Sequence, residues 1–125
     1  MNNMDEYKYK EITSQIINAA HVVHNSLGYG FLEKVYRNSL VIELTKRGFP
    51  VQVEKPISVR YDGQIVGEYF ADIVVNDKVI VEVKATEKHN SVFEAQLLNY
   101  LRATALEVGL IINFGTSVQV KRMVL

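Results

Sequence analysis

The spacing of apolar residues predicts two helices in the first part of the chain. The first covers residues 7–27 and ends at Gly28, because glycine readily adopts the backbone that terminates a helix. The second follows the loop at residues 28–30 and ends at Gly48. The residues expected to face the core are Ile12, Ile16, Ala19, Ala20, Val23 and Leu27 in the first helix and Phe31, Leu32, Val35, Leu40 and Leu44 in the second.

From residue 51 the period of the apolar residues changes to the alternation typical of strands. Asp62-Gly63 and Asn76-Asp77 separate the apolar runs, and these residue types tolerate the left-handed backbone of a tight hairpin turn. Pro56 cannot donate a backbone hydrogen bond, which favours an edge strand or a bulge. We therefore expect an antiparallel meander of three strands, over residues 51–61, 65–75 and 80–85.

A third helix and two more strands are predicted in the last third of the chain. Ser91 and Glu94 have the Ser-x-x-Glu spacing of a capping box, so the helix should begin near Ser91. Residues 108–114 form a continuous apolar run, typical of a strand buried on both faces, and residues 118–123 alternate. The predicted fold class is α/β (α+β mixed), with the order α-α-β-β-β-α-β-β and a mixed central sheet flanked by helices.

Composition limits the kind of protein this can be. The chain has 125 residues, of which 48% are hydrophobic and 22% charged, and this suits a single domain over residues 1–125. The absence of cysteine excludes disulfides and thiolate metal sites. The polar start and the lack of an apolar stretch of bilayer length predict a soluble, cytoplasmic protein with no membrane partner. Fourteen basic residues balance fourteen acidic ones, so a polyanion must be held by a local patch.

The most informative residues are three charged side chains on neighbouring strands. Glu82 and Lys84 are two residues apart in the third expected strand, so they share one face of it. Asp72 lies in the preceding strand, and pairing through the intervening turn brings it close enough to Glu82 to bind one cation. Helices on both faces of the sheet would partly desolvate these groups, and the two carboxylates would raise each other's pKa unless a cation lay between them.

A divalent ion with oxygen ligands is the natural partner for such a pair. Mg²⁺ takes only one or two protein carboxylates and keeps several waters, which suits a small site open to a phosphate. Lys84 beside the ion would orient a metal-bound water or stabilise charge on a phosphate oxygen. The alternative is an ordinary ion pair between Glu82 and Lys84 at the sheet margin, with Asp72 as its cross-strand neighbour.

Two helices offer further polar residues. Gly30, Glu33 and Tyr36 are spaced by three, which places them near one helical face. Glu33 could simply offset the positive end of the helix dipole. Gln96 and Tyr100 are four apart and share a face of the third helix, where partly exposed polar residues are also common.

Together these residues resemble a known family. The pattern Gly30-x-x-Glu33-x-x-Tyr36 resembles the signature of small bacterial proteins called GxxExxY proteins, which are placed in the PD-(D/E)XK nuclease superfamily. The resemblance covers nearly the whole chain. It implies an α-β-β-β-α-β core and metal-dependent hydrolysis of phosphodiester bonds. Ala71 stands where the superfamily name has proline, a position that is often replaced in relatives.

The resemblance also implies roles for individual residues. Asp72 matches the motif acid, and Glu82 and Lys84 match the (D/E)-x-K element. Glu33 matches a helical acid that some branches add to the metal site. The Gln-x-x-x-Tyr element of the RecB-like branch, which lies beside the site, is matched by Gln96 and Tyr100.

These roles give a mechanism to test. Asp72 and Glu82 would be direct metal ligands, with the Val83 carbonyl as a further ligand and Glu33 acting directly or through water. Lys84 would position the attacking water. The substrate phosphate would be oriented, or the ligand shell fixed, by Gln96 and Tyr100.

The predicted function is that of a Mg²⁺-dependent nuclease, with Mn²⁺ as an alternative ion, acting on DNA or RNA. Candidate phosphate-binding groups are Lys84, Lys88 and His89 after the motif strand, with Lys34 and Arg37 on the second helix. Solvated surface is the expected position of the last two. The competing interpretation is a nuclease-like binding or accessory protein that acts through a partner or a homodimer. A phosphoester hydrolase with a substrate other than nucleic acid would use the same metal chemistry.

Overall fold

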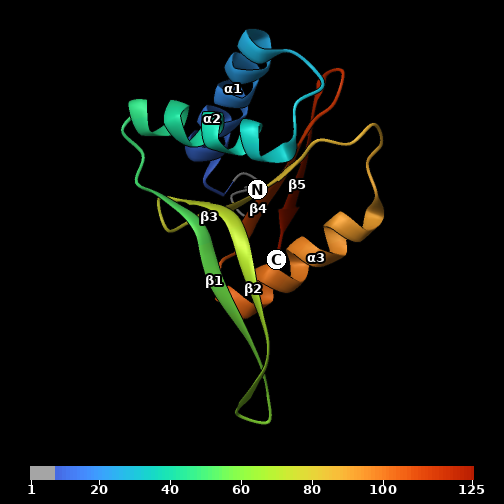
Figure 1. The fold of residues 1–125 in the computed structure, drawn as a ribbon. Coiled ribbons are helices and arrows are strands. Elements are labelled where there is room, and N and C mark those ends of the chain that lie inside the picture. Colours follow the sequence, from blue (N-terminus) through green and yellow to red (C-terminus); the bar gives the residue numbers. More distant parts are fainter. Residues whose placement is uncertain (1–7) are drawn as a thin grey trace, which may run out of the picture.

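The computed structural model describes residues 8–125 and has the predicted order of elements (Figure 1). The predicted start of the first helix, at Tyr7, lies outside the described residues. None of the helices in the described part has the length and apolar character needed to cross a membrane. The helices are α1 (Lys10–Leu27), α2 (Glu33–Lys46) and α3 (Ser91–Thr104), and the strands are β1 (Val51–Tyr61), β2 (Gln64–Val75), β3 (Val79–Lys84), β4 (Val108–Phe114) and β5 (Val118–Val124).

The five strands form one mixed sheet in the order β1-β2-β3-β4-β5. β1, β2 and β3 are the predicted antiparallel meander, and β4 runs parallel to β3 because α3 carries the chain across the sheet between them. β5 returns antiparallel to β4. Pro56 lies on the edge strand β1, as expected for a residue without a backbone donor. β3, which carries Glu82 and Lys84, is the central strand.

Residues with a left-handed backbone conformation form the turns of both hairpins, as predicted. Asp62 and Gly63 have φ angles of 53° and 77° and join β1 to β2 in a two-residue turn. Asn76 and Asp77, with φ angles of 55° and 51°, begin the turn between β2 and β3. The second turn fixes the register that determines which residues of β2 and β3 face each other.

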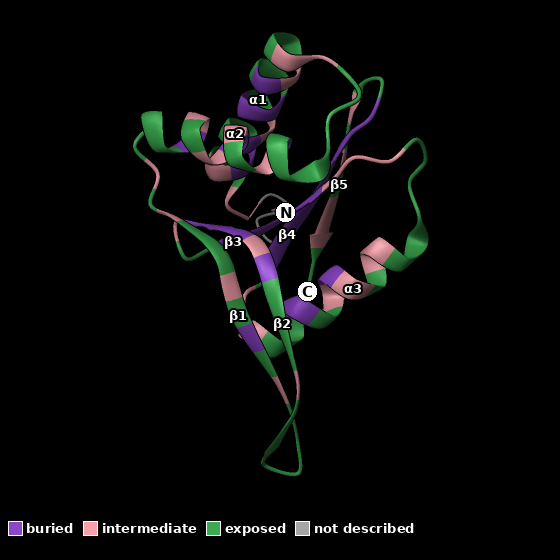
Figure 2. Cartoon of the chain, viewed as in Figure 1, coloured by how far each residue is buried: buried purple, intermediate pink, exposed green. Residues whose placement is uncertain are grey.

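Helices cover both faces of the sheet, so its central strands are shielded on two sides (Figures 1 and 2). α1 and α2 pack on one face, where Val81 and Val83 of β3 join their core. α3 packs on the other face, where Leu97 and Leu101 contact Ile80 and its neighbours. All residues of β4 are buried, which confirms the strand predicted from its continuous apolar run.

The apolar stripe predicted for α2 is partly wrong. The buried residues of this helix are Tyr36, Leu40 and Leu44, each four positions apart. Phe31 and Leu32 precede the helix and are 49% and 79% exposed, and Val35 is also exposed. The helix is rotated so that the row containing Tyr36 faces the sheet. Glu33 is exposed at the first position of the helix, so it does not share the buried surroundings of Tyr36.

The predicted cap of α3 is also wrong. The side chain of Asn90 accepts a hydrogen bond from the Val92 N–H at 2.9 Å, so Asn90 is the N-cap and Ser91 is the first helical residue. Glu94 bonds to His89 at 2.6 Å instead of completing a capping box. The N-cap lies one residue before the predicted position because asparagine is a preferred N-cap residue and Asn90 directly precedes the serine.

Tyr36 fixes the loop between α1 and α2 to the sheet. Its hydroxyl donates to the Gly28 carbonyl at 2.6 Å and accepts from the Phe31 N–H at 3.2 Å. Its ring stacks on Phe114 of β4, with centroids 4.6 Å apart and planes 9° from parallel. The start of α2, and with it Glu33, is therefore held close to the carboxyl ends of β3 and β4.

Replacing Tyr36 with Phe should destabilise the protein by about 1–3 kcal/mol, because two partly buried hydrogen bonds, to the Gly28 carbonyl and from the Phe31 amide, would be lost at about 0.5–1.5 kcal/mol each. The measurement is the urea unfolding midpoint. Tyr29→Phe is the matched control, since Tyr29 lies in the same loop and is 54% exposed. Equal midpoints for the two variants would contradict the anchoring role of the Tyr36 hydroxyl.

Candidate functional site

Strands β2 and β3 separate next to Asp72 and Glu82. The last paired residues of the two strands are Ile73 and Val81, so the register places Asp72 opposite Glu82 at the next position. Here the side chains bond to the backbone instead: the Val83 N–H donates to Asp72 Oδ2 at 2.8 Å, and the Asp72 N–H donates to Glu82 Oε2 at 3.0 Å. We call this point the fork. Reciprocal hydrogen bonds hold both carboxylates in it.

A kink in the outer hairpin accounts for the separation. Glu54 of β1 lies between residues that pair with Ile73 and Ala71, and its φ angle is 50°. Ala71 and Val74 both pack in the core under α3, whereas Ile73 packs in the opposite core, so the alternation of β2 is broken beside Asp72. The hairpin bends away from β3 at this point, and the fork opens.

Burial perturbs both acids, and the charge of Asp72 adds to the effect on Glu82. Glu82 is only 4% exposed. Burial is the main cause that raises its pKa to about 8, and the charge of Asp72 raises it further. Burial also raises the pKa of Asp72, although the Val83 N–H and Lys84 act in the opposite direction. The pKa rise expected from the neighbouring acid is thus found at Glu82, whereas the nearby charge that raises the pKa of Asp72 is that of Glu54.

Glu33 lies at the rim of the fork. Partial burial raises its pKa, the charge of Lys84 lowers it and the charge of Asp72 raises it, so these three groups are within electrostatic reach of one another. As the side chains stand, however, no group of three or more His, Cys, Asp or Glu residues within residues 8–125 is close enough together to hold a metal ion. The structure brings Asp72 and Glu82 together and places Glu33 near them.

The fork nevertheless has a donor set that suits a small divalent cation. Asp72 and Glu82 each use one carboxylate oxygen for a backbone amide, and the other oxygen takes part in no hydrogen bond within the described chain. The N–H and C=O of one strand residue point to the same neighbouring strand, so the Val83 carbonyl also faces the fork. Mg²⁺ requires only one or two protein carboxylates and completes its shell with water, which this arrangement permits.

Lys84 adds positive charge beside the acids. Its Nζ lies 4.7 Å from the centre of the Phe93 ring on α3, and no ion pair to an acid holds it there among residues 8–125. Its charge nevertheless lowers the pKa values of Glu33, Asp72 and Glu82. The amine is thus close to all three carboxylates without being committed to one.

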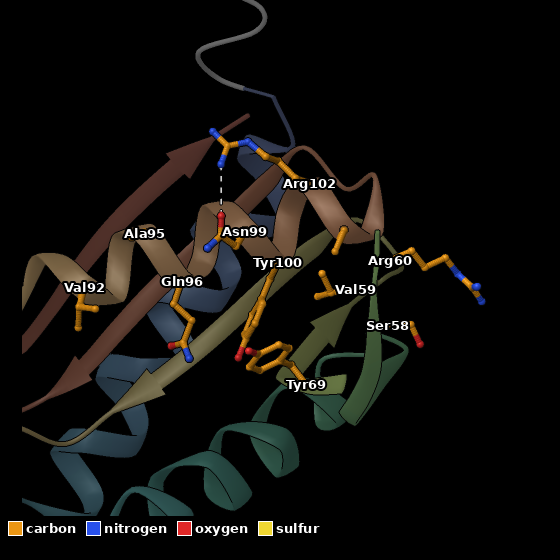
Figure 3. A pocket seen from close by; sticks show the side chains of 11 residues that line it. Ser58, Val59, Arg60, Tyr69, Val92, Ala95, Gln96, Asn99, Tyr100 and Arg102 are labelled. Atoms are coloured by element: carbon orange, nitrogen blue, oxygen red, sulfur yellow. Dashed lines mark hydrogen bonds between the residues drawn. The ribbon is translucent and has the colours of Figure 1, made fainter. Parts of the chain in front are cut away.

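Gln96 and Tyr100 connect the fork to a groove of about 880 Å³ between α3 and the hairpin of β1 and β2 (Figure 3). Both side chains line this groove. Burial raises the pKa of Tyr100, and the charges of Glu82 and Asp72 raise it further, so the phenol lies within electrostatic reach of both acids. The structure therefore brings the groove and the two acids together at Tyr100.

The candidate phosphate-binding residues have different surroundings. Lys34 is exposed, as predicted, and Lys88 is exposed as well. His89 is bonded to Glu94, with Nε2 and Oε2 2.6 Å apart, so it already has a partner.

The prediction that Arg37 is solvated is wrong. Its side chain is only 16% exposed and forms an ion pair with Glu54 at 3.2 Å. It also lowers the pKa values of Asp72 and Glu33. Sequence reasoning missed this role because the pair joins α2 to the kink of β1. The available signal was the four-residue spacing from Glu33, which places both side chains on one helical face.

Comparisons with known proteins agree with this architecture. A family model described as the PD-(D/E)XK nuclease superfamily matches residues 10–123. The crystal structure of a protein named SSO0001 is similar, with a TM-score of 0.56 and 15% sequence identity. That match covers 73% of this chain and 48% of the other, so this chain spans about half the length of that relative, and the likeness concerns the fold alone. A search among curated proteins finds no match.

The perturbed pKa of Glu82 predicts how stability depends on pH in metal-free protein. Its folded-state pKa of about 8 exceeds the ordinary value of 4.5, so between these values the folded protein holds a proton that the unfolded chain has lost. The free energy of unfolding therefore falls as pH rises through this window. In EDTA, urea unfolding should report a loss of at least about 1.4 kcal/mol between about pH 5 and pH 9, the equivalent of one pKa unit.

Glu82→Gln should remove most of this dependence, because the amide does not titrate. Glu68→Gln is the control, since Glu68 is exposed on β2. Equal pH slopes for wild type and Glu82→Gln would show that Glu82 is not a buried, perturbed acid.

Proposed function

The chain belongs to the PD-(D/E)XK nuclease superfamily, and from this premise we propose that it is a nuclease that uses Mg²⁺, or Mn²⁺ in its place, to hydrolyse phosphodiester bonds of DNA or RNA. The observation that carries the proposal is the pair of buried carboxylates at the fork, each fixed by the backbone with one oxygen uncommitted. Such crowding of negative charge is costly unless a cation neutralises it.

Three groups on two strands would hold the cation. They are the carboxylates of Asp72 and Glu82 and the carbonyl of Val83. Glu33, at the rim, would act through a bound water. When bound, Mg²⁺ supplies Lewis acidity at a phosphate oxygen and lowers the pKa of water. The backbone bonds of the two acids keep their positions fixed during the reaction, which is the supporting role that outer contacts have in metal sites.

Lys84 would act on the water or the phosphate. Its ammonium lies near all three acids and carries donors that can orient an attacking water or offset charge on a phosphate oxygen. The side chains of Gln96 and Tyr100 would hold the substrate phosphate where the groove meets the fork.

The motif around Glu33 supports the finer proposal that this is a GxxExxY protein. Gly30 has a φ angle of 112°, a conformation that favours glycine. Glu33 begins α2 at the rim of the fork, and Tyr36 anchors the loop between α1 and α2 to β4. Gly30 and Tyr36 thus shape and anchor the loop that positions the carboxylate of Glu33.

A second candidate function is binding without catalysis. Phe31 and Leu32 are exposed beside Glu33, and apolar side chains at such a rim suit an accessory protein that binds a partner or a second copy of itself. The two functions differ in whether Glu82 and Lys84 are needed for cleavage.

Glu82→Ala and Lys84→Ala should each lower nuclease activity at least about a hundredfold, because one removes a metal ligand and the other a charge-stabilising group. The measurement is cleavage of generic single- and double-stranded DNA and RNA with Mg²⁺ or Mn²⁺. Glu68→Ala and Lys46→Ala, which change exposed residues away from the fork, are the matched controls. Activity that survives both fork substitutions at the level of the controls would rule out the assignment.

Mg²⁺ should stabilise the folded protein against heat. A ligand that binds only the folded state, at about 100 times its dissociation constant, adds about 2.7 kcal/mol to the free energy of unfolding. Thermal melting with and without Mg²⁺ measures this shift, and Glu82→Gln should abolish it by removing a charged ligand. An equal shift in Glu82→Gln would place the binding elsewhere, and the absence of a shift in wild type would favour the accessory function.

A further inference from the structure

We infer that the groove between α3 and the β1–β2 hairpin binds single-stranded nucleic acid by stacking a base on Tyr69 (Figure 3). The inference rests on the proposed function, because it names the substrate class that the fork would cleave. The groove measures about 880 Å³ and reaches Tyr100, whose pKa responds to both acids of the fork. A strand lying in the groove would therefore pass the candidate metal ligands.

Tyr69 offers an aromatic surface at the right place. It lines the groove, and its side chain is 49% exposed although it lies on a strand beside the core. Its ring centroid is 5.9 Å from that of Tyr100, with the planes tilted by 46°. Figure 3 shows Tyr69, Tyr100 and Gln96 directed toward the same part of the groove. A base stacked on Tyr69 would place its neighbouring phosphate near Gln96 and Tyr100.

The charge of the lining suits a nucleic-acid strand. Arg60 and Arg102 line the groove, and no Asp or Glu does. Both guanidinium groups extend away from the two tyrosines in Figure 3. Each has only a long hydrogen bond, from Arg60 to the Gly63 carbonyl at 3.5 Å and from Arg102 to Asn99 at 3.3 Å. Two arginines among the lining residues, set apart from the aromatic rings, suit a strand whose phosphates contact the arginines while a base stacks on the rings.

The same charges are too few for duplex binding. Double-stranded DNA is held mainly by contacts to its phosphates, commonly about 6–10 of them, with base contacts adding sequence choice. Two arginines in a chain with 14 basic and 14 acidic residues do not supply such a surface. Stacking must then contribute much of the affinity, and it requires bases that are not already paired and stacked in a duplex.

The remaining lining supports binding without a fixed sequence. Ser58, Gln96 and Asn99 can each donate or accept hydrogen bonds, and Val59 and Ala95 provide apolar surface between them. Side chains of this kind tolerate any base, because every base has an aromatic face and polar edges. We therefore expect little preference between sequences and a clear preference for single strands.

The test measures binding in EDTA, where cleavage is suppressed. Fluorescence anisotropy compares a short labelled oligonucleotide of mixed sequence, as DNA and as RNA, with its duplex form. Wild type should bind the single strands more tightly than the duplex. Tyr69→Ala should weaken single-strand binding about five- to hundredfold, the range expected for the loss of one stacked base. Tyr69→Phe, which keeps the ring, should bind like wild type.

Tyr61→Ala is the matched control, because Tyr61 is 77% exposed at the end of the same hairpin and does not line the groove. Tyr69→Leu keeps an apolar side chain without an aromatic face, so it separates stacking from folding if Tyr69→Ala is unstable by thermal melting. Equal affinity for single strand and duplex, no binding of either, or unchanged binding in both Tyr69→Ala and Tyr69→Leu would overturn the inference.

These outcomes are distinct from failure of the proposed function. If Tyr69 is required for single-strand binding but added Mg²⁺ or Mn²⁺ produces no cleavage, the inference stands and the nuclease proposal fails. If single strands and duplexes are cleaved equally, and Tyr69→Ala cleaves both as wild type does, the nuclease proposal stands and the inference fails.

Discussion

The hydrogen bonds between the carboxylates of Asp72 and Glu82 and the backbone of the opposite strand are the constraint on which the site depends. Where β2 and β3 part, buried backbone amides need new acceptors, and the two carboxylates supply them. The main chain thus fixes both acids at the position where the pairing of β2 and β3 ends. The cost is the burial of negative charge, expressed in the raised pKa values of both groups. A cation between them would offset this cost.

Other elements meet at the fork and modify its charge. Arg37 of α2 pairs with Glu54 at the kink of β1, so the helix at the rim is tied to the residue that opens the fork. Lys84 stands beside three carboxylates with its amine over Phe93. Arg37 already has a partner, so the three carboxylates outnumber the positive charge that Lys84 supplies. This imbalance is what a metal site requires before its ion binds.

Local signals were sufficient to predict much of the fold from sequence. Asp62-Gly63 specified one hairpin, and the uninterrupted apolar run of β4 identified a strand covered on both faces. Asp72 and Glu82 could be brought together because the turn at Asn76 fixes the register between their strands. These predictions succeeded because each depends on residues that are close in the sequence or joined by a short turn.

The wrong predictions concern features that depend on contacts between residues far apart in the sequence. The face of α2 is set by the hydroxyl and ring of Tyr36, which contact the preceding loop and β4, so Phe31 and Leu32 remain exposed despite their apolar character. The burial of Arg37 depends on Glu54, which lies on another element. The kink at Glu54 itself has no sequence signal, because its left-handed backbone occurs at a residue type that does not favour it.

The most direct test of the central claim is a crystal structure of the protein grown with Mn²⁺, examined by anomalous scattering. The account predicts a peak at the fork, in contact with carboxylate oxygens of both Asp72 and Glu82. A structure in which Mn²⁺ binds elsewhere, while these two carboxylates keep only their backbone partners, would contradict it.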